Sequence, residues 1–232
     1  MAIILHIESA TRFCSVAISR DGLVLASQSS DATYQHAQML TTLIDQCQKS
    51  SGIALSDLEA VSVSDGPGSF TALRVGMSTA KGICFGLKIP LIGVPTLQSL
   101  AQQLKNTLEG QVIPQEVMLC PMIDARRMEV YTNLFDWDLN PLIEDTAMII
   151  KASAFQEYFE EGKTLFFTGD GCEKCQAVIT HERAIFKPME NSATAMVPFA
   201  DRAFEAGQFL DLVYAEPHYL KAPNITKPKK LL

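Results

Sequence analysis

The sequence lacks a surplus of positive charge. Its 19 Lys and Arg residues face 26 Asp and Glu residues, which gives a net charge of −7. Residues 1–105 carry seven basic and seven acidic side chains, residues 106–220 carry eight and 19, and the last twelve residues add four lysines. Binding to duplex or folded RNA usually requires clustered basic residues. Acting alone, the chain is therefore predicted to be a poor nucleic-acid binder.

The sequence also lacks a long apolar run and a second pair of metal ligands. No apolar stretch approaches the ~18 residues of a membrane span, and Ile3–Ile7 predicts a first strand rather than a signal peptide. The six cysteines are dispersed, as is typical of buried thiols in a reducing compartment. Cys172 and Cys175 have C-x-x-C spacing, but zinc needs further ligands. We expect ordinary helix-start cysteines, with a metal or redox role as the lesser alternative, in a cytoplasmic protein with no membrane contact.

What the sequence does contain is a sizeable apolar fraction, 47%, in regularly alternating patterns. Bounded apolar runs predict strands and 3.6-residue periodicity predicts helices. The first half predicts strands at 3–7, 14–20, 23–28, 60–64 and 90–94, and helices at 35–49, 69–87 and 96–108, the last capped by Thr96. The second half predicts strands at 117–123, 129–136, 142–149 and 164–169, and helices at 153–161 and 193–206. The chain is therefore predicted to be an α/β protein with a βββαβα unit that recurs in abbreviated form. A break at Gly110–Gln115 predicts domains at 1–109 and 110–232.

Six of the thirteen glycines lie in Gly66–Gly93. The turn Asp65-Gly-Pro-Gly68 leads into a helix, and free N–H groups at such a helix start can bind an anion. The segment lacks the G-K-[ST] of a P-loop and the G-x-G-x-x-G of a dinucleotide fold. It also lacks a G-x-S-x-G nucleophile elbow. Two interpretations stay open, a tight strand-to-helix turn and an anion site.

The helix at 69–87 has more apolar and small-residue surface than packing on one sheet requires. Ala72, Gly76 and Ala80 form one small-residue stripe, and a second consists of Ser78, Gly82 and Gly86. The face around Arg74, Lys81 and Phe85 is predicted to point to solvent. The surplus indicates packing against either another helix of this chain or a partner subunit.

Four stretches resemble the TsaB (YeaZ) family, bacterial subunits needed for threonylcarbamoyladenosine modification of tRNA. The most specific is Gly66-Pro-Gly-Ser-Phe-Thr-Ala-Leu-Arg-Val-Gly76 with Ala80-Lys81-Gly82. Ile4-Leu-His-Ile-Glu8-Ser9, the turn Ile123–Tyr131 and Glu216–Lys221 are similar as well. The resemblance covers essentially the whole chain. It implies the two-lobed fold of actin, sugar kinases and heat-shock ATPases, with duplicated βββαβα units and an abbreviated second lobe.

The resemblance also argues against catalysis. In the catalytic paralogue TsaD, the segment similar to Pro90–Leu100 carries an H-x-x-x-H metal pair, whereas this chain has Thr96 and Leu100 at those positions. A leucine cannot ligate a metal and a lone threonine hydroxyl is a weak ligand. The first turn, usually Asp-Thr-Ser, reads Glu8-Ser9-Ala10 here. We therefore expect no catalytic residues, no metal ligands and no resident cofactor, with nucleotide binding at a subunit interface left open.

The resemblance further implies a scaffold that docks through two helices on a TsaD-like catalytic subunit, or on a second copy when alone. A TsaE-like ATPase would join the complex, and tRNA would be held mainly by the partners. The predicted interface consists of His36, Met39, Leu40, Leu43, Cys47, Phe70, Leu73, Arg74, Met77, Ser78 and Lys81. The predicted anion or nucleotide turn consists of Glu8, Ser9, Gly66, Gly68 and Ser69. The alternatives are a nucleotide-dependent kinase or metal-dependent glycoprotease-like hydrolase, and a homodimeric binding module for another protein.

Overall fold

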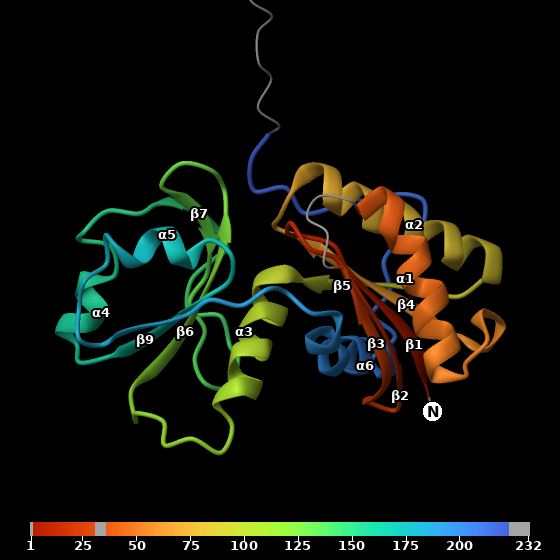
Figure 1. The fold of residues 1–232 in the computed structure, drawn as a ribbon, viewed down its shortest axis with the longest axis horizontal. Helices are drawn as coiled ribbons and strands as arrows, with labels where there is room; N and C mark the ends of the chain where they lie inside the picture. Colours follow the sequence, from red (N-terminus) through yellow and green to blue (C-terminus); the bar gives the residue numbers. More distant parts are fainter. Residues whose placement is uncertain (1, 31–35, 223–232) are drawn as a thin grey trace, which may run out of the picture.

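The computed structural model describes residues 2–30 and 36–222, and these residues form two lobes, each built on a five-stranded sheet (Figure 1). In the first lobe the strand order is β3-β2-β1-β4-β5. The strands are β1 (Ile3–Glu8), β2 (Ser15–Arg20), β3 (Leu23–Ser29), β4 (Ala60–Gly66) and β5 (Leu91–Pro95). Its helices are α1 (His36–Ser51), α2 (Phe70–Leu87) and α3 (Thr96–Leu108), with a short 3-10 turn, η1, at Leu55–Asp57. The first three strands pair antiparallel, and β4 and β5 add in parallel.

The second lobe repeats this topology strand for strand. Its order, β10-β9-β6-β7-β8, matches the first sheet with the same parallel and antiparallel pairings. The strands are β6 (Val117–Asp124), β7 (Glu129–Thr132), β8 (Thr146–Ile149), β9 (Thr164–Thr168) and β10 (Ala184–Lys187). The helices are α4 (Gln156–Glu160) and α5 (Cys172–Gln176), five residues each where α1 and α2 have 16 and 18. The predicted duplication and the abbreviation of its second copy are confirmed.

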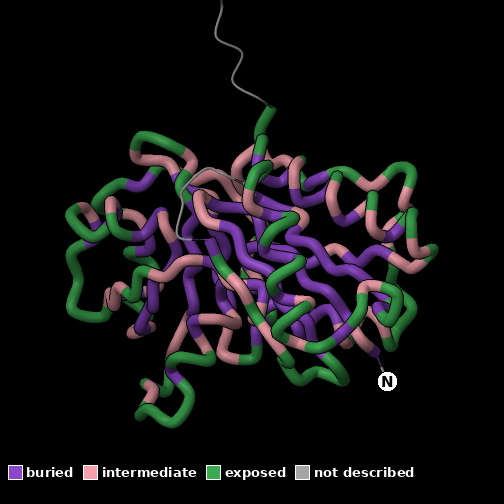
Figure 2. Tube along the Cα trace, turned by 45° about the vertical axis from the view of Figure 1, so that its right-hand side comes forward, coloured by how far each residue is buried: buried purple, intermediate pink, exposed green. Residues whose placement is uncertain are grey.

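Three apolar cores stabilise the two lobes. Most residues of the strands are buried, whereas the outer faces of the helices are exposed (Figure 2). One core lies under α1 and α2, and another lies under α4 and α5. The third lies between the lobes and joins α3 to both sheets. It also includes the 3-10 turn η2 (Ala193–Met196) and α6 (Val197–Glu205), which return to the first sheet. The division into domains at residue 109 stays a prediction, because η2 and α6 follow the second sheet in the sequence but pack on the first.

Several local expectations need correction. The strand predicted at 129–136 is interrupted after Thr132, where Asn133 accepts the Leu134 N–H and donates to Asp145. The chain pairs with β6 again at Phe135, which exchanges two backbone hydrogen bonds with Leu119. The strand predicted at 142–149 accordingly starts at Thr146. The predicted helix 193–206 begins as a 3-10 turn, and 153–161 shortens to α4.

One element, β10, was not predicted from the sequence, and α5 was indicated only by the expectation that Cys172 and Cys175 lie at a helix start. Each has only four or five residues, which is too short for a clear periodicity. Thr96 does not cap α3 with its side chain, since the N-cap is Pro95 and the Thr96 hydroxyl accepts the Gly66 N–H instead. No helix among residues 2–30 and 36–222 has the length and apolar character to cross a bilayer.

The two small-residue stripes of α2 have opposite environments. Ala72, Gly76 and Ala80 are buried against the sheet, and a Cβ on Gly76 would overlap Ser9 Oγ. Ser78, Gly82 and Gly86 are exposed, and the space above both glycines is open to at least 4 Å. The first stripe thus lets α2 approach the β1–β2 turn closely, while the second faces away from the described part of the chain.

Gly76→Ala and Gly82→Ala form a matched pair that tests this difference. Gly76→Ala is expected to lower the free energy of unfolding by about 1–3 kcal/mol, because the new methyl group overpacks against Ser9. Gly82→Ala is expected to raise it by up to about 1 kcal/mol, because alanine favours the helix and meets no neighbour. Urea denaturation of both variants measures the two effects. Equal effects of the same sign would contradict the packing of α2.

Candidate functional site

The polar turns at the ends of β1 and β6 have the same construction. After β1, Glu8 Oε1 accepts the Ala10 N–H at 2.7 Å, and after β6, Asp124 Oδ1 accepts the Arg126 N–H at 2.9 Å. Each turn is also tied to the end of the neighbouring parallel strand of its own lobe. The Ser9 N–H donates to Ser64 Oγ, and the Asp124 N–H donates to Asp170 Oδ1. The duplication therefore extends from the sheets to the turns between the lobes.

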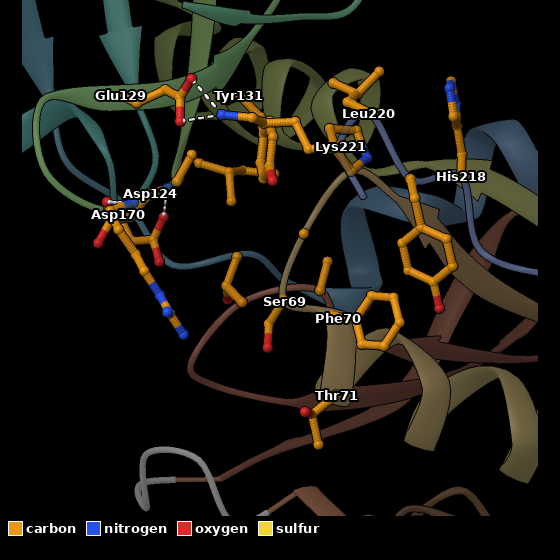
Figure 3. A pocket seen from close by; sticks show the side chains of 18 of the residues that line it. Ser69, Phe70, Thr71, Asp124, Glu129, Tyr131, Asp170, His218, Leu220 and Lys221 are labelled. Carbon is orange, nitrogen blue, oxygen red and sulfur yellow. Dashed lines mark hydrogen bonds and ion pairs between the residues drawn. The ribbon is translucent and has the colours of Figure 1, made fainter. Parts of the chain in front are cut away.

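A cleft of about 370 Å³ lies between these turns. Figure 3 shows Asp124, Glu129 and Asp170 of the second lobe on one side, with Ser69 and Phe70 of the first lobe opposite. The lining comes from the β1–β2 turn, the start of α2, the β6–β7 turn and the end of the described chain. These residues are Ala10–Arg12, Pro67–Thr71, Ile123–Arg126, Glu129, Tyr131, Asp170 and His218–Ala222.

The charges along this cleft are largely compensated. Arg12 pairs with Glu190 at 2.6 Å and Lys221 with Glu129 at 2.7 Å, while Lys174 pairs with Asp124. The Arg12–Glu190 hydrogen bond raises the pKa of the Arg12 guanidinium, so this cation stays charged. The cleft is thus a polar seam between lobes rather than a strongly positive anion site.

The predicted anion turn is only partly exposed to this cleft. Gly68 and Ser69 line it, but Glu8 and Ser9 are fully buried and are absent from its lining. A Cβ on Gly68 would overlap Ala10 O, and the Ser69 N–H donates to that same carbonyl at 2.7 Å. One N–H at the start of α2 is therefore already used inside the chain. The contacts favour the tight-turn interpretation, and anion binding stays a prediction.

Gly66 is explained by a different close approach. Its φ is +120°, which side chains rarely adopt, and a Cβ there would overlap the carbonyl of His218. Glycine is therefore needed at this position so that the backbone at His218 can pack against the turn. This contact could not be predicted from the sequence, because 152 positions separate the two residues.

Buried carboxyl groups surround the turn after β1 and β4. Desolvation raises the pKa of Glu8 to about 7, and the hydrogen bond from Ala10 opposes this only in part. Desolvation likewise raises the pKa of Asp65 to about 6. Glu8 Oε2 has no hydrogen-bond partner among the described residues. The carboxyl of Glu8 is therefore folded back into its own lobe and faces the interior rather than the cleft.

The two positions at which TsaD carries its metal pair lie in the core of this chain. The Thr96 hydroxyl accepts the Gly66 N–H at 3.1 Å, and Thr96 is fully buried. Leu100 packs beside Gly169, where a Cβ would overlap Leu100 Cδ2. One face of α3 therefore touches the glycine turns of both lobes, Gly66–Gly68 and Gly169–Gly171, through a hydrogen bond and an apolar contact.

Cys172 and Cys175 also lie in a core rather than at a surface. Both belong to α5 and are buried on its inner side, and desolvation raises the pKa of both thiols, that of Cys172 to about 12. Thiols in this state are poor nucleophiles and poor metal ligands. Within the described ranges no three His, Cys, Asp or Glu side chains come together as a metal site.

The predicted partner interface divides into buried and accessible residues. Leu40, Leu43, Cys47, Leu73 and Met77 pack into the core between α1, α2 and the sheet, each at most 3% exposed. These five side chains are not available to a partner, and a charged residue in place of Leu43 would disrupt the core. The apolar arc of α1 packs on the sheet of its own lobe. The sequence could not predict this, because 3.6-residue periodicity identifies an apolar face but not the element that covers it.

The other predicted interface residues that the structure describes are exposed or half-buried, and Met39 among them packs against the core under α1 and α2. Arg74 and Ser78 are exposed, while Met39, Phe70 and Lys81 are half-buried. The side chain of His36 lies outside the described residues. Phe85, which is 79% exposed, and the glycines of the outer stripe were not among the predicted interface residues. The helical periodicity of α2 had nevertheless indicated that Phe85 points to solvent.

Comparisons with known proteins agree with this architecture. The family model described as TsaD, tRNA N6-adenosine threonylcarbamoyltransferase, matches residues 24–147. The tRNA threonylcarbamoyladenosine biosynthesis protein TsaB of Escherichia coli is 31% identical over 229 residues, which cover 94% of each chain.

Two solved structures share the fold. YeaZ from Pseudomonas aeruginosa superposes with a TM-score of 0.77 at 24% identity, covering 95% of this chain and all of that one. A polyphosphate/ATP-glucomannokinase from Arthrobacter sp. superposes with a TM-score of 0.51 at 12% identity, covering 88% of this chain and all of that one. The expected relation to the sugar-kinase fold is confirmed.

Glu8→Gln tests the buried carboxyl. Since the pKa of Glu8 is about 7 in the folded chain and about 4.5 unfolded, the native state binds more protons between these values. The contribution of Glu8 to stability therefore falls as the pH rises from 4.5 to 7, by about 3 kcal/mol in all. Glu8→Gln should gain stability over wild type at pH 8 and gain little at pH 4.5. Urea denaturation across this range measures the difference.

Glu144→Gln, at an exposed position, is the matched control and should leave the pH profile unchanged. Parallel profiles of wild type and Glu8→Gln would show that the Glu8 carboxyl is not buried as described.

Proposed function

The chain belongs to the TsaB family, and on that premise we propose that it is the non-catalytic subunit that activates a TsaD-type catalytic subunit. It acts in the biosynthesis of threonylcarbamoyladenosine in tRNA. The transfer of threonylcarbamoyl to the tRNA adenosine next to the anticodon would take place on that partner. This chain would hold the partner in its active conformation and work in the cytoplasm, where tRNA is modified.

The observation that carries the non-catalytic role is the chemistry of Thr96 and Leu100. Both side chains are buried and committed to the two glycine turns. Neither a leucine nor a single hydroxyl that already accepts a hydrogen bond can replace a pair of histidine ligands. The residues at this position therefore stabilise α3 and do not fit a catalytic metal.

The outer face of α2 is the surface that best suits the partner. Ser78, Gly82 and Gly86 form the exposed stripe of small residues, next to Phe85. Small residues let a second helix approach closely, and an exposed aromatic side chain can anchor it. An 18-residue helix offers a long enough contact for pairing with a helix of the partner.

The charge distribution supports a division of labour within the complex. Three ion pairs compensate much of the charge at the cleft, and residues 106–220 carry a net charge of −11, from eight basic and 19 acidic residues. Such a surface would repel an RNA backbone. We infer that tRNA is held mainly by the partners, with a TsaE-type ATPase in the same complex, and that the chain alone pairs with a second copy through the same helix.

Gly82→Glu tests the docking surface. A carboxylate in the exposed stripe should lower the affinity for a TsaD-type subunit at least tenfold, because binding would bury an unpaired charge. The fold should be retained, since glutamate favours the helix more than glycine does. Calorimetry of the purified pair measures the affinity. Ser153→Glu, on the second lobe, adds the same charge at an exposed position and should bind normally. Unchanged affinity of Gly82→Glu would place the interface elsewhere.

Reconstitution tests the function itself. Modification of tRNA by a TsaD-type subunit and a TsaE-type ATPase should require this chain, and Gly82→Glu should reduce it in parallel with affinity. Modification that proceeds equally without the chain would overturn the proposal. Stoichiometric Mg-ATP binding by the isolated chain, followed by phosphoryl transfer or peptide hydrolysis, would favour the kinase or hydrolase alternative. Capture of a different protein by the outer face of α2 would favour the third class, a homodimeric binding module.

A further inference from the structure

The last described segment, Leu210–Lys221, follows a path that touches both lobes, and we call it the C-terminal strap. It starts at the edge of the first sheet, where the Leu210 N–H donates to Leu91 O at 2.8 Å. Leu210, Leu212 and Ala215 pack against the core under α1 and α2. In Figure 1 this blue segment then passes from α2 across the top of the molecule toward β7.

Along α2 the strap is held by two basic side chains. Lys81 Nζ donates to the carbonyls of Val213 and Ala215 at 3.1 and 3.0 Å. Two turns earlier, Arg74 Nε donates to the hydroxyl of Tyr219 at 3.2 Å. The Tyr219 ring lies 4.6 Å from that of Phe70, centroid to centroid, and the Arg74 guanidinium lies 3.9 Å from the Phe70 centroid. Three residues predicted to form the partner interface are thus bound to the strap.

The strap next contacts the glycine turn that precedes α2. The His218 N–H donates to Asp65 O at 2.6 Å, and its carbonyl lies against Gly66, where no Cβ fits. At its far end Lys221 Nζ reaches the second lobe and donates to both carboxylate oxygens of Glu129, each at 2.7 Å (Figure 3). The strap therefore crosses one side of the cleft and ends on the opposite lobe.

The closing contact differs from the others in kind. Lys221 is 44% exposed and Glu129 is 19% exposed, so their ion pair is accessible to solvent. Such pairs contribute little free energy and respond to salt. The contacts with the first lobe, by contrast, combine main-chain hydrogen bonds with apolar burial. The strap is thus fixed firmly on the first lobe and loosely on the second.

We propose that the C-terminal strap is a latch that couples the outer face of α2 to the opening of the cleft between the lobes. Lys81 and Arg74 set the course of the strap over α2, and this course decides whether Lys221 reaches Glu129. A molecule that docks on α2 and moves these two side chains would release or tighten the latch. The naming of a TsaD-type subunit as that molecule rests on the proposed function, whereas the latch itself does not.

The test measures the separation of the lobes within one chain, with the doubly labelled protein diluted into an excess of unlabelled protein so that distances between paired copies do not contribute. Spin labels at Thr42→Cys on α1 and Glu157→Cys on α4 report on the distance between the lobes, since both positions are exposed and all six native cysteines are buried. Lys221→Ala is expected to shift at least a third of the distance distribution to longer values. Lys81→Met, which removes the ammonium group at the other end of the strap, should produce a similar shift although it contacts neither the cleft nor the second lobe.

The double variant distinguishes a latch from two unrelated contacts. If the strap transmits the effect, Lys81→Met with Lys221→Ala should open the lobes no further than either change alone. Lys163→Ala, which removes an ion pair with Glu116 within the second lobe, is the matched control and should leave the distribution unchanged. Additive shifts, or no shift in Lys81→Met, would overturn the coupling, and no shift in Lys221→Ala would overturn the latch.

The partner gives a second readout that separates this inference from the proposed function. Calorimetry first establishes whether a TsaD-type subunit binds, which tests the proposed function. Where it binds, it should change the distance distribution of wild type and leave that of Lys81→Met unchanged. Binding with equal changes in both proteins would overturn the coupling while leaving the docking on α2 intact.

Discussion

The contact of α3 with two glycine turns is the constraint on which the rest of the molecule depends. The Thr96 hydroxyl holds the turn after β4, and Leu100, one helical turn later, packs against the turn after β9. Side chains at i and i+4 share one face of a helix, so a single face can fix both lobes at once. Because these contacts leave no room for a Cβ at Gly169 and use the N–H of Gly66, they set how closely the lobes approach.

This arrangement leaves a polar cleft between the lobes of a fold that resembles that of a sugar kinase. The turns that face one another after β1 and β6 keep their carboxylates, but Glu8 folds back into the first lobe and accepts the N–H of Ala10. Three ion pairs compensate much of the other charge in and beside the cleft. The duplicated framework therefore combines a largely charge-compensated cleft between the lobes with an exposed stripe of small residues on the outside of α2.

The conformation of the strap links these two regions. The glycine at position 66 and the basic residues at 74 and 81 belong to the most specific sequence signature, and each contacts the strap. A signature that looked like a ligand turn followed by an interface helix is thus also the docking site of the chain's own C-terminal segment. Ser78, Gly82 and Phe85, on the same helix, are exposed and have no contact with the strap.

The sequence by itself determined the order of the elements, the duplication, the bounds of α3 and the unsuitability of Thr96 and Leu100 as metal ligands. These follow from local periodicity and from the chemistry of single side chains. Only the tertiary structure decided that Leu43 and Met77 are core, that the stripe of Gly82 faces outward, and that Lys81 holds carbonyls more than 130 positions away. The physical reason is that periodicity identifies an apolar face, whereas the neighbour that covers it comes from distant parts of the chain. The short strand β10 escaped prediction, and α5 was indicated only by its cysteines. The reason is related, since the stability of such short elements comes from the sheet beside them rather than from their own sequence.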